Sequence, residues 1–524
     1  MDAIWTTATE LTGLEERIIK RCGKRRVFVF LRELRHRIFD ASIQDRLSAA
    51  YAEIARGKER IAPAQLGMAL LLQAALDVPD HEVVELTVMD RRWQMVLGCL
   101  GAEEPLFAQG TLYNFRQRMI EHGLDQELFD KTVALARETG GFSATHLRAA
   151  FDASPLWGAG RVEDTFNLIG RAAMHVVRTA ADRLGRPFAE VAADAGIPVV
   201  AATSIKTGLD IDWDDPNARK HALTKLLGQV QSLGRWLEQE LKEQMALPPL
   251  EQQWKLVQKL IAQDTEPDPD GGGGRRITEG VAKDRRISVS DGDMRHGRKS
   301  KRKRIDGYKR HIAVDVDTPG LICGVAVTPA NQPERTASEA LLADLNRQKL
   351  KLSELFIDRG YLGDESIEAA RQQGLQVHCK PFPLRNGDRF DKGDFNIDLS
   401  ANTVRCPDGV VVPLRFGASV HFPSKSCGPC AQRAACTSAK QGRGRSLAIH
   451  PNEPFMLELR QQAKSVEGRA NLRTRVKVEH GLATLHTRQG ERARYKGLRK
   501  NLFDVRRHAA LENLFVIDRL RRAA

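Results

Sequence analysis

The feature that most constrains this chain is a pattern that occurs twice: a short apolar strand, an aspartate, and then residues that break a strand. Residues 147–155 read LRAAFDASP, with Asp152 after the apolar run. Residues 351–365 read KLSELFIDRGYLGDE, with Asp358 after the apolar run and before a helical segment. A carboxylate at the end of a buried strand is held rigidly and faces a cleft, which suits a metal ligand. An aspartate followed by glycine is also a common turn former, so both interpretations are open at this point.

The stretch between the two aspartates predicts a mixed sheet. Residues 308–317 and 321–329 have strand patterns on either side of a Thr-Pro-Gly turn, and residues 336–346 have the apolar spacing of a helix. The order strand, hairpin, helix, strand is compatible with an α/β fold in which helices flank a mixed sheet.

The first 140 residues are predicted to be helical. Within them, residues 109–119 form a helix candidate that offers Thr111 as its cap. Arg116 and Arg118 give this helix a basic side, which is compatible with a DNA contact and equally with ordinary packing.

A second helical region is predicted after Asp152. It covers about 162–260 and has apolar residues at three- and four-residue spacing, without a recognisable catalytic signature. Residues 264–274 contain four consecutive glycines and predict a flexible linker or loop.

Positive charge is concentrated in parts of the chain. The 524 residues carry a net charge of +14, and residues 401–524 contain 24 Lys and Arg against 9 Asp and Glu. A second basic cluster covers residues 295–304. Such blocks favour a nucleic acid over a membrane as partner, with a solvated basic face as the alternative. We see no run of about 18 apolar residues and no signal peptide, so a cytoplasmic protein is expected.

Four of the eight cysteines lie close together in the sequence, at Cys406, Cys427, Cys430 and Cys436. The middle pair forms a CxxC motif around Gly-Pro, which presents two thiolates to one tetrahedral ion. Disulfides are disfavoured in the cytosol. The spacing therefore predicts a structural Zn²⁺ site, with reduced unliganded cysteines and a redox function as alternatives.

Residues 470–482 predict a basic helix near the end of the chain. Arg475 and Glu479 lie four residues apart on one face of this helix, the usual spacing of a helix-stabilising ion pair. A basic run that includes Arg494 and Lys496 follows.

Taken together, these segments resemble a bacterial DDE insertion-sequence transposase, most like the 1182-type family within the broader ribonuclease-H-like group. The similarity covers nearly the whole chain and rests on the order and content of its motifs. The segments that carry it are FDASPL at 151–156, GAGRVEDT at 158–165, GYKRHIAVD at 307–315, TPAN at 328–331, IDRGY at 357–361 and RVKVEH at 475–480.

The resemblance implies three catalytic carboxylates. Asp152 matches the first, on the first strand of the ribonuclease-H-like sheet, and Asp358 matches the second, after the fourth strand. Glu479 matches the third, on a later helix. Glu491 is the alternative for the third position. Glu512 is less suitable because it lies in an amphipathic helix predicted over residues 511–520, near the end of the chain.

The surroundings of the third carboxylate depart from the wider group. Relatives there carry a Tyr, Arg, Glu and Lys signature, in which Arg475 and Glu479 keep their places. Leu472 replaces the Tyr and His486 replaces the Lys. The DNA contacts that those two residues make elsewhere are therefore not carried over to this chain.

The resemblance also implies the reaction: cleavage of the ends of an insertion sequence and joining of the freed 3′-hydroxyls to target DNA. Two Mg²⁺ (or Mn²⁺) ions about 3.5–4 Å apart serve such chemistry, and hard cations take oxygen ligands. Asp152 and Asp358 would bridge or flank the ions, and Glu479 would complete the second site. Two alternatives are a nuclease that cuts without joining and a catalytically silent, zinc-supported DNA-binding protein derived from a transposase.

The predicted architecture has four parts. They are a helical DNA-binding domain over 1–140, a ribonuclease-H-like core over 141–398 with a helical insertion at about 162–280, a cysteine-rich zinc module over 399–445, and C-terminal helices over 446–524 that complete the core. The N-terminal helices would recognise terminal inverted repeats of double-stranded DNA, and paired ends imply a homodimer. The basic residues expected to contact DNA are Arg116, Arg118, Arg298, Lys299, Lys309, Arg475, Arg494 and Lys496.

Overall fold

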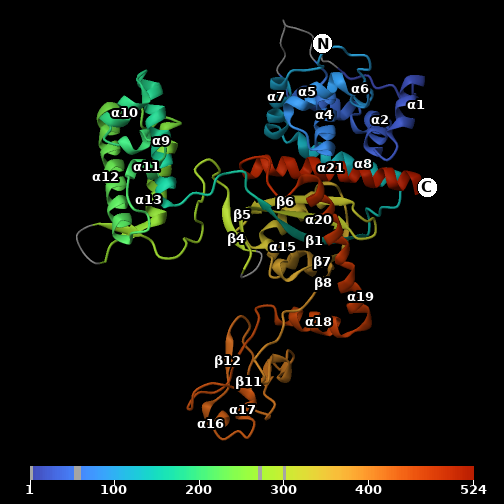
Figure 1. Cartoon of the computed structure of the whole chain (residues 1–524). Helices are drawn as coiled ribbons and strands as arrows, with labels where there is room; N and C mark the ends of the chain where they lie inside the picture. The colour runs from blue at the N-terminus through green and yellow to red at the C-terminus, as the bar shows by residue number, and fades with distance from the viewer. Residues whose placement is uncertain (1–3, 52–60, 270–273, 299–301, 524) are drawn as a thin grey trace.

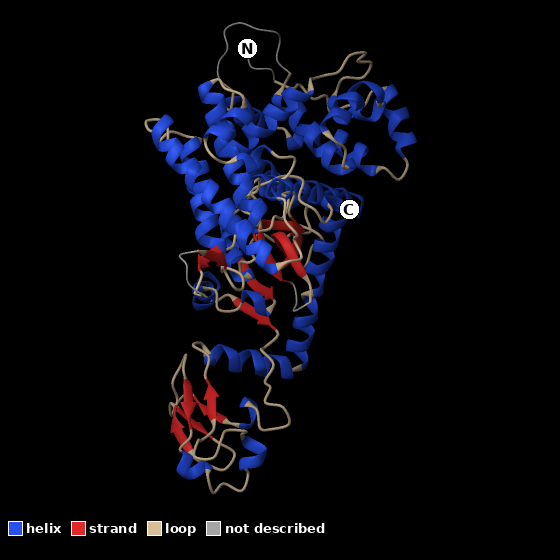
Figure 2. Ribbon diagram, turned by 60° about the vertical axis from the view of Figure 1, so that its left-hand side comes forward, coloured by secondary structure: helices blue, strands red, loops and turns tan. Residues whose placement is uncertain are grey.

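The computed structural model describes residues 4–51, 61–269, 274–298 and 302–523. A mixed sheet lies at the centre, and the N-terminal helices pack above it across the long C-terminal helix (Figure 1). A separate group of helices stands at one flank of the sheet (Figure 1). A small module with strands of its own lies at the far end from the N-terminal helices (Figure 2).

The central sheet has the strand order β4–β5–β1–β7–β8, and β6 also pairs with β5. The bounds are β1 (Leu147–Trp157), β4 (Arg295–Arg298), β5 (Arg304–Asp315), β6 (Ile322–Pro329), β7 (Leu352–Ile357) and β8 (Gln376–Cys379). β5 is antiparallel to β1 and to β6, whereas β1, β7 and β8 are parallel. As a result β1, β6 and β7 run in the same direction, and their carboxyl ends lie at the same edge of the sheet. This confirms a mixed α/β sheet and is consistent with the expected ribonuclease-H-like core.

β1 does not end at Asp152, which corrects one expectation. The strand continues through Pro155 to Trp157, because β5 pairs with it along this whole length. The parallel partner β7 pairs only with residues 147–150, so one edge of β1 is open beyond that point. A proline is tolerated at such an edge, where no ladder hydrogen bond is lost. Asp152 therefore lies where the neighbouring strand ends rather than where its own strand ends.

Eight helices precede the sheet among the described residues. They are α1 (Gly13–Cys22), α2 (Arg26–Ile38), α3 (Ala41–Ala49), α4 (Pro63–Leu76), α5 (Asp80–Met89), α6 (Arg91–Leu97), α7 (Gln109–Glu121) and α8 (Leu124–Thr139). The helical prediction for this region is confirmed. Thr111 is not the cap of α7, because the helix begins two residues earlier, after Ala108, without a side-chain cap.

The insertion after β1 has a hydrophobic core of its own. Its elements are α9 (Thr165–Leu184), α10 (Phe188–Asp194), η1 (Pro198–Ala201), α11 (Ile205–Leu209), α12 (Pro216–Glu240) and α13 (Leu250–Asp264). β2 (Thr265–Pro267) and β3 (Arg275–Ile277) pair as a hairpin after α13, where the glycine-rich linker was expected. Residues 270–273 of that linker lie outside the described residues.

The cysteine-rich region forms the small module of short strands and single-turn helices. It contains η4 (Lys392–Asp394), β9 (Asn396–Asp398), β10 (Thr403–Arg405), β11 (Val411–Pro413), β12 (Ser419–His421), α16 (Ser424–Cys427), α17 (Arg433–Cys436) and β13 (Ser446–Ala448). Phe395, Val404 and Phe422 belong to its compact apolar core, against which three of the cysteines pack.

The remaining helices complete the body around the sheet. They are η2 (Glu334–Ala337), α14 (Ser338–Arg347), η3 (Arg359–Tyr361), α15 (Glu365–Gln372), α18 (Glu453–Lys464), α19 (Val466–Thr474), α20 (Val476–Gln489) and α21 (Leu498–Ala523). The single helix expected over residues 470–482 is broken at Arg475, between α19 and α20. Gly481 lets α20 lie close to β5, since a Cβ there would be 3.1 Å from a methyl group of Val314.

α21 joins the N-terminal helices to the sheet. It packs against α4 and α8 on one side and against β6 on the other. One continuous hydrophobic cluster accordingly includes residues of the N-terminal helices, the sheet and α21. Throughout the described ranges, no helix combines the length and the apolar character needed to cross a membrane.

Candidate active site

Asp152 lies partly buried on β1, with 15% of its side chain exposed. Burial raises the pKa of this carboxyl above its usual value, and the negative charges of Asp358 and Glu479 raise it further. The backbone N–H of Ala153 and the guanidinium of Arg475 oppose this shift of the pKa. Asp358 and Glu479 are therefore each near enough to Asp152 to interact with it electrostatically.

Arg475 stands between two of these carboxylates. Its Nη1 donates to Oδ2 of Asp152 at 3.1 Å, and its Nη2 donates to Oε1 of Glu479 at 2.9 Å. The ion pair of Arg475 and Glu479 was expected from their spacing, whereas the pair with Asp152 was not. Glu479 lies at the start of α20 with 52% of its side chain exposed.

Asp358 follows β7 and caps the short helix η3. Its Oδ1 accepts a hydrogen bond from the backbone N–H of Gly360 at 2.7 Å. The turn-forming interpretation and the site interpretation of this aspartate are thus compatible. The capping contact uses one carboxylate oxygen and fixes the direction of the other.

Glu334 is a further acidic residue at this position that was not among the predicted site residues. Burial raises the pKa of Glu334 to about 7, and the adjacent charge of Asp358 contributes in the same direction. Lys309 opposes that shift, and Asp152 adds to it. The available signal was a related pattern in a different order, since Glu334 follows the strand β6 and then a proline.

The alternative third carboxylates lie elsewhere. Glu491 is 71% exposed beside His486, and its backbone oxygen accepts a hydrogen bond from Trp157 at the far end of β1. Glu512 is buried and paired with Arg488. Neither shares a partner with Asp152, as Glu479 does through Arg475.

The donor chemistry of the site fits a hard divalent cation. Carboxylate oxygens on rigid strand ends are the ligands that Mg²⁺ takes in proteins. The mutual repulsion that raises the pKa of Asp152 is the effect that a bound cation would relieve. Within the described ranges, no group of three or more His, Cys, Asp or Glu side chains has the geometry of a formed metal site.

The two arginines predicted on α7 differ in their surroundings. Arg116 is buried and pairs with Asp80, from Nη2 to Oδ1 at 2.6 Å. Its guanidinium does not face solvent, so the expectation of a DNA contact is corrected to a structural role. Arg118 is half-buried and lies over the ring of Tyr51 at 4.3 Å from the centroid.

Two other predicted DNA contacts lie beside the carboxylates. Arg298 and Lys309 line an open pocket whose wall includes the residues that directly follow Asp152 on β1. Glu334 and residues 153–155 of β1 belong to the same pocket. Lys299 lies outside the described residues. A phosphate-sized anion beside the carboxylates would meet both cations.

The last two predicted DNA contacts lie on the segment between α20 and α21. Arg494 donates to the backbone oxygen of Val78 at 2.8 Å and pairs with Asp77 at 3.3 Å. Lys496 is exposed to solvent.

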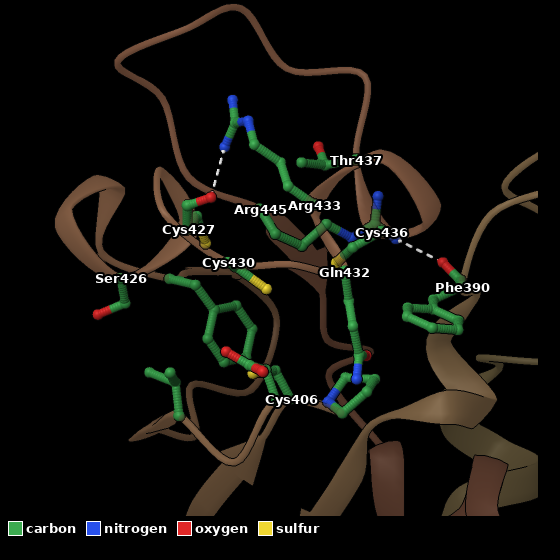
Figure 3. A pocket seen from close by; sticks show the side chains of 14 residues that line it. Phe390, Cys406, Ser426, Cys427, Cys430, Gln432, Arg433, Cys436, Thr437 and Arg445 are labelled. Atoms are coloured by element: carbon green, nitrogen blue, oxygen red, sulfur yellow. Dashed lines mark hydrogen bonds between the residues drawn. The ribbon is translucent and has the colours of Figure 1, made fainter.

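The four clustered cysteines gather around one pocket of the module. Cys406, Cys427, Cys430 and Cys436 all line it, from a strand end and from α16 and α17 (Figure 3). All four are free thiols. Burial raises the pKa of Cys436, and the other three cysteines also act on it. Phe390 lines the same pocket and contributes an apolar wall.

The chain matches two family models. Residues 278–514 match the model of the Transposase DDE domain, and residues 16–118 match that of a Transposase domain (DUF772). The first match includes Asp358, Glu334 and Glu479, and the second covers α1 to most of α7. No solved structure matches the chain significantly.

Short similarities to curated proteins are also found. The chain is 29% identical over 114 residues to a probable protein kinase UbiB of Shewanella loihica, which is 21% of each chain. It is 31% identical over 94 residues to the proteins of that name from Shewanella halifaxensis and Shewanella woodyi, 18% of this chain and 17% of theirs. The chain thus spans about a fifth of the length of these relatives.

Proposed function

This chain belongs to the bacterial DDE insertion-sequence transposases, and on that premise we propose that it cuts the ends of its insertion sequence and joins them to target DNA. The single observation that carries the chemistry is the convergence of Asp152 and Asp358 from parallel neighbouring strands, with Glu479 tied to Asp152 through Arg475. The similarities to the probable protein kinases of Shewanella cover too little of either chain to support a kinase activity for this protein.

Two Mg²⁺ or Mn²⁺ ions, when bound, supply an activated water or 3′-hydroxyl and stabilise the leaving oxygen of the phosphodiester. Asp152 and Asp358 would hold these ions at the edge where β1 and β7 meet, and Glu479 would complete the ligand set. Lys309 holds a phosphate of the DNA strand beside the carboxylates. Arg475 is freed from the carboxylates in that state and can then contact the DNA backbone.

The DNA partner is the double-stranded terminal inverted repeat, followed by target DNA. The outward side of α7, with Thr111, Tyr113 and Asn114 exposed, is the surface that we propose to contact the repeat. Two ends must be brought together before joining, so the active assembly is proposed to be a homodimer on paired ends.

We also propose that the cysteine-rich module holds a structural Zn²⁺. The support is that Cys406, Cys427, Cys430 and Cys436 line one pocket as free thiols in a module with a small core. Soft thiolates favour zinc, and a small core gains stability from such a cross-link.

Metal analysis tests the zinc proposal. Protein purified without chelator is expected to contain one zinc per chain, and Cys430→Ser is expected to lose it. Cys99→Ser is the control, since Cys99 lies outside the module. Wild-type protein without zinc would remove this part of the proposal.

The test of the activity is Mg²⁺-dependent cleavage and joining of the element's own end DNA. Wild type is expected to cut and join, and Asp152→Asn, Asp358→Asn and Glu479→Gln are each expected to lose at least about a hundredfold in rate. If only the Glu479 variant still cuts, the third carboxylate lies elsewhere, with Glu491 tested next. If wild type cuts the end DNA without joining it to target DNA, the protein is a nuclease. If wild type binds the end DNA without cutting it, the protein is a catalytically silent DNA-binding protein.

A further inference from the structure

Glu334 lies at the same edge of the sheet as the two aspartates. β6 runs parallel to β1 and β7, so the segments that follow β6 and β7 leave the sheet in the same direction. η2 begins at Glu334 and packs against η3, which is capped by Asp358. The topology thus brings a third strand-following carboxylate to this place.

The carboxylate of Glu334 makes a close approach to Asp358 across Gly360. A Cβ built on Gly360 would be only 2.1 Å from Oε2 of Glu334 and 3.0 Å from Oδ1 of Asp358. The backbone of Gly360 is not in the left-handed region, so the missing side chain, and not an unusual conformation, is what this contact needs.

The charge of Lys309 offsets the repulsion at this contact only in part, since the pKa of Glu334 stays raised. Of the ion pairs formed in the described part of the chain, none includes Glu334. Lys309 is near, but its Nζ donates to the backbone oxygen of Gln332 at 2.8 Å. Two carboxylates in contact are unfavourable unless a cation or a proton lies between them. Packing gives no reason for this contact, and a divalent cation shared by the two carboxylates would stabilise it in place of a proton.

We propose that Glu334 is a fourth carboxylate of the active site, and that it binds the divalent cation together with Asp358. The inference rests on the proposed function, because it places the cation at the same site. Gly360 is a positioning residue, since its lack of a side chain allows Glu334 to reach Asp358.

The test measures Mn²⁺ binding to the full-length protein without DNA, by titration calorimetry and by the Mn²⁺ paramagnetic resonance signal. Glu334→Gln and Gly360→Ala are each expected to weaken Mn²⁺ binding by about tenfold or more. Glu339→Gln, on the exposed side of α14, is the matched control and is expected to bind as wild type does. Glu334→Gln is also expected to raise the Tm of the metal-free protein, because it removes the repulsion from Asp358.

Glu334→Gln could weaken Mn²⁺ binding either because a negative charge is lost from the site or because a ligand is lost. The Gly360→Ala variant separates these two causes. It keeps every charge and displaces mainly the Glu334 side chain, because the added Cβ would lie 2.1 Å from Oε2 of Glu334 but 3.0 Å from Oδ1 of Asp358. Weakened binding in both variants therefore supports a ligand role. Mn²⁺ affinity within about twofold of wild type in Glu334→Gln, with Asp358→Asn weakened, would overturn the inference. Wild type that binds Mn²⁺ through Glu334 but never cuts end DNA would support the inference and overturn the proposed function.

Discussion

The guanidinium of Arg475 lies 3.1 Å from the carboxylate of Asp152, although 322 residues separate them in the sequence. The same guanidinium contacts Glu479 at 2.9 Å. Arg475 lies at the break between α19 and α20, which directs its side chain toward β1. Its single positive charge therefore offsets part of the negative charge of the two carboxylates that a divalent cation would have to share.

This contact predicts competition between Arg475 and the metal. Arg475→Met keeps the length of the side chain and removes its charge, so Mn²⁺ binding without DNA is expected to tighten by about threefold to tenfold. Arg473→Met, one residue before the end of α19 and exposed, is the control. Calorimetric titration measures the affinity, and unchanged or weaker binding in Arg475→Met would show that the arginine supports the site rather than competing for it.

Lys309 is predicted to contact one DNA phosphate beside the carboxylates. Lys309→Ala should weaken binding of end DNA and of unrelated DNA alike, because a phosphate contact carries no sequence information. The slope of log K against log salt is expected to fall in magnitude by about 0.9, the value for one phosphate contact. Lys255→Ala, on the insertion and paired only with Glu251, should leave the slope unchanged. If Lys309→Ala weakened binding only to the element's own ends and not to unrelated DNA, this role would be contradicted.

Arg116 is predicted to stabilise the fold and not to contact DNA. It belongs to a chain of part-buried and buried hydrogen bonds that runs from α7 through α5, α4, α21 and α20 to the strand that carries Lys309. The successive members are Arg116, Asp80, Gln73, Arg507, Asp504, Gln489 and Arg310. This chain connects the N-terminal helices to the sheet by polar contacts in addition to the shared apolar core.

Replacing Arg116 leaves Asp80 without its charge partner in a mostly buried position. Arg116→Ala is therefore expected to lower the free energy of unfolding by about 3 kcal/mol. Urea unfolding followed by circular dichroism measures the change, and Arg118→Ala, on the same helix and less buried, is the comparison. Equal stability of the two variants, with DNA binding lost only in Arg116→Ala, would restore the DNA-contact interpretation.

The sequence was most informative where a local pattern carries the chemistry. Asp358 and the strand before it were predicted because the apolar run, the aspartate and the glycines are adjacent. The extent of β1 beyond Asp152 was not predictable, because it depends on pairing with β5 about 150 residues away. The burial of Arg116 and the pairing of Arg475 with Asp152 likewise depend on which face of a helix meets a distant segment. Glu334 was missed because residues 330–333 separate it from the apolar run of β6, so the carboxylate does not directly follow the strand as Asp358 does.

Glu453 gives a prediction of pH dependence for the junction between the module and α18. Burial alone would raise the pKa of Glu453, but hydrogen bonds from Lys392, from the backbone N–H of His450 and from Arg460 bring it below its usual value. A carboxyl with a lowered pKa in the folded state contributes stability above its unfolded pKa and loses it as the pH falls through the folded value.

Glu453→Gln is therefore expected to destabilise the protein at pH 7 by about 2–3 kcal/mol. The difference in the free energy of unfolding between Glu453→Gln and wild type should shrink as the pH falls below the usual carboxyl range, because protonated Glu453 in wild type then loses the same contribution. Denaturant unfolding of both proteins at several pH values measures it, with Glu458→Gln, an exposed neighbour on α18, as the control. A difference that stays constant down to pH 3 would exclude the ion pair as its cause.

The insertion is predicted to fold separately from the sheet. Its hydrophobic core is distinct from the main one, and its two ends meet where the N–H of Glu163 donates to the backbone oxygen of Ile287 at 2.9 Å. A short glycine-serine linker can thus replace residues 164–286 at a small entropic cost. Because Arg171, the ion-pair partner of buried Glu163, is removed with the insertion, the shortened protein should also carry Glu163→Gln.

The shortened protein is expected to unfold in one cooperative transition, with a Tm within a few degrees of that of the same transition in the full chain. Residues 164–286 expressed alone are expected to give the circular dichroism of a folded helical bundle. Scanning calorimetry of the two pieces and of the full chain makes the comparison. If the shortened protein aggregates or melts without cooperativity while the full chain does not, the insertion must stabilise the sheet directly, and the separate-folding prediction is wrong.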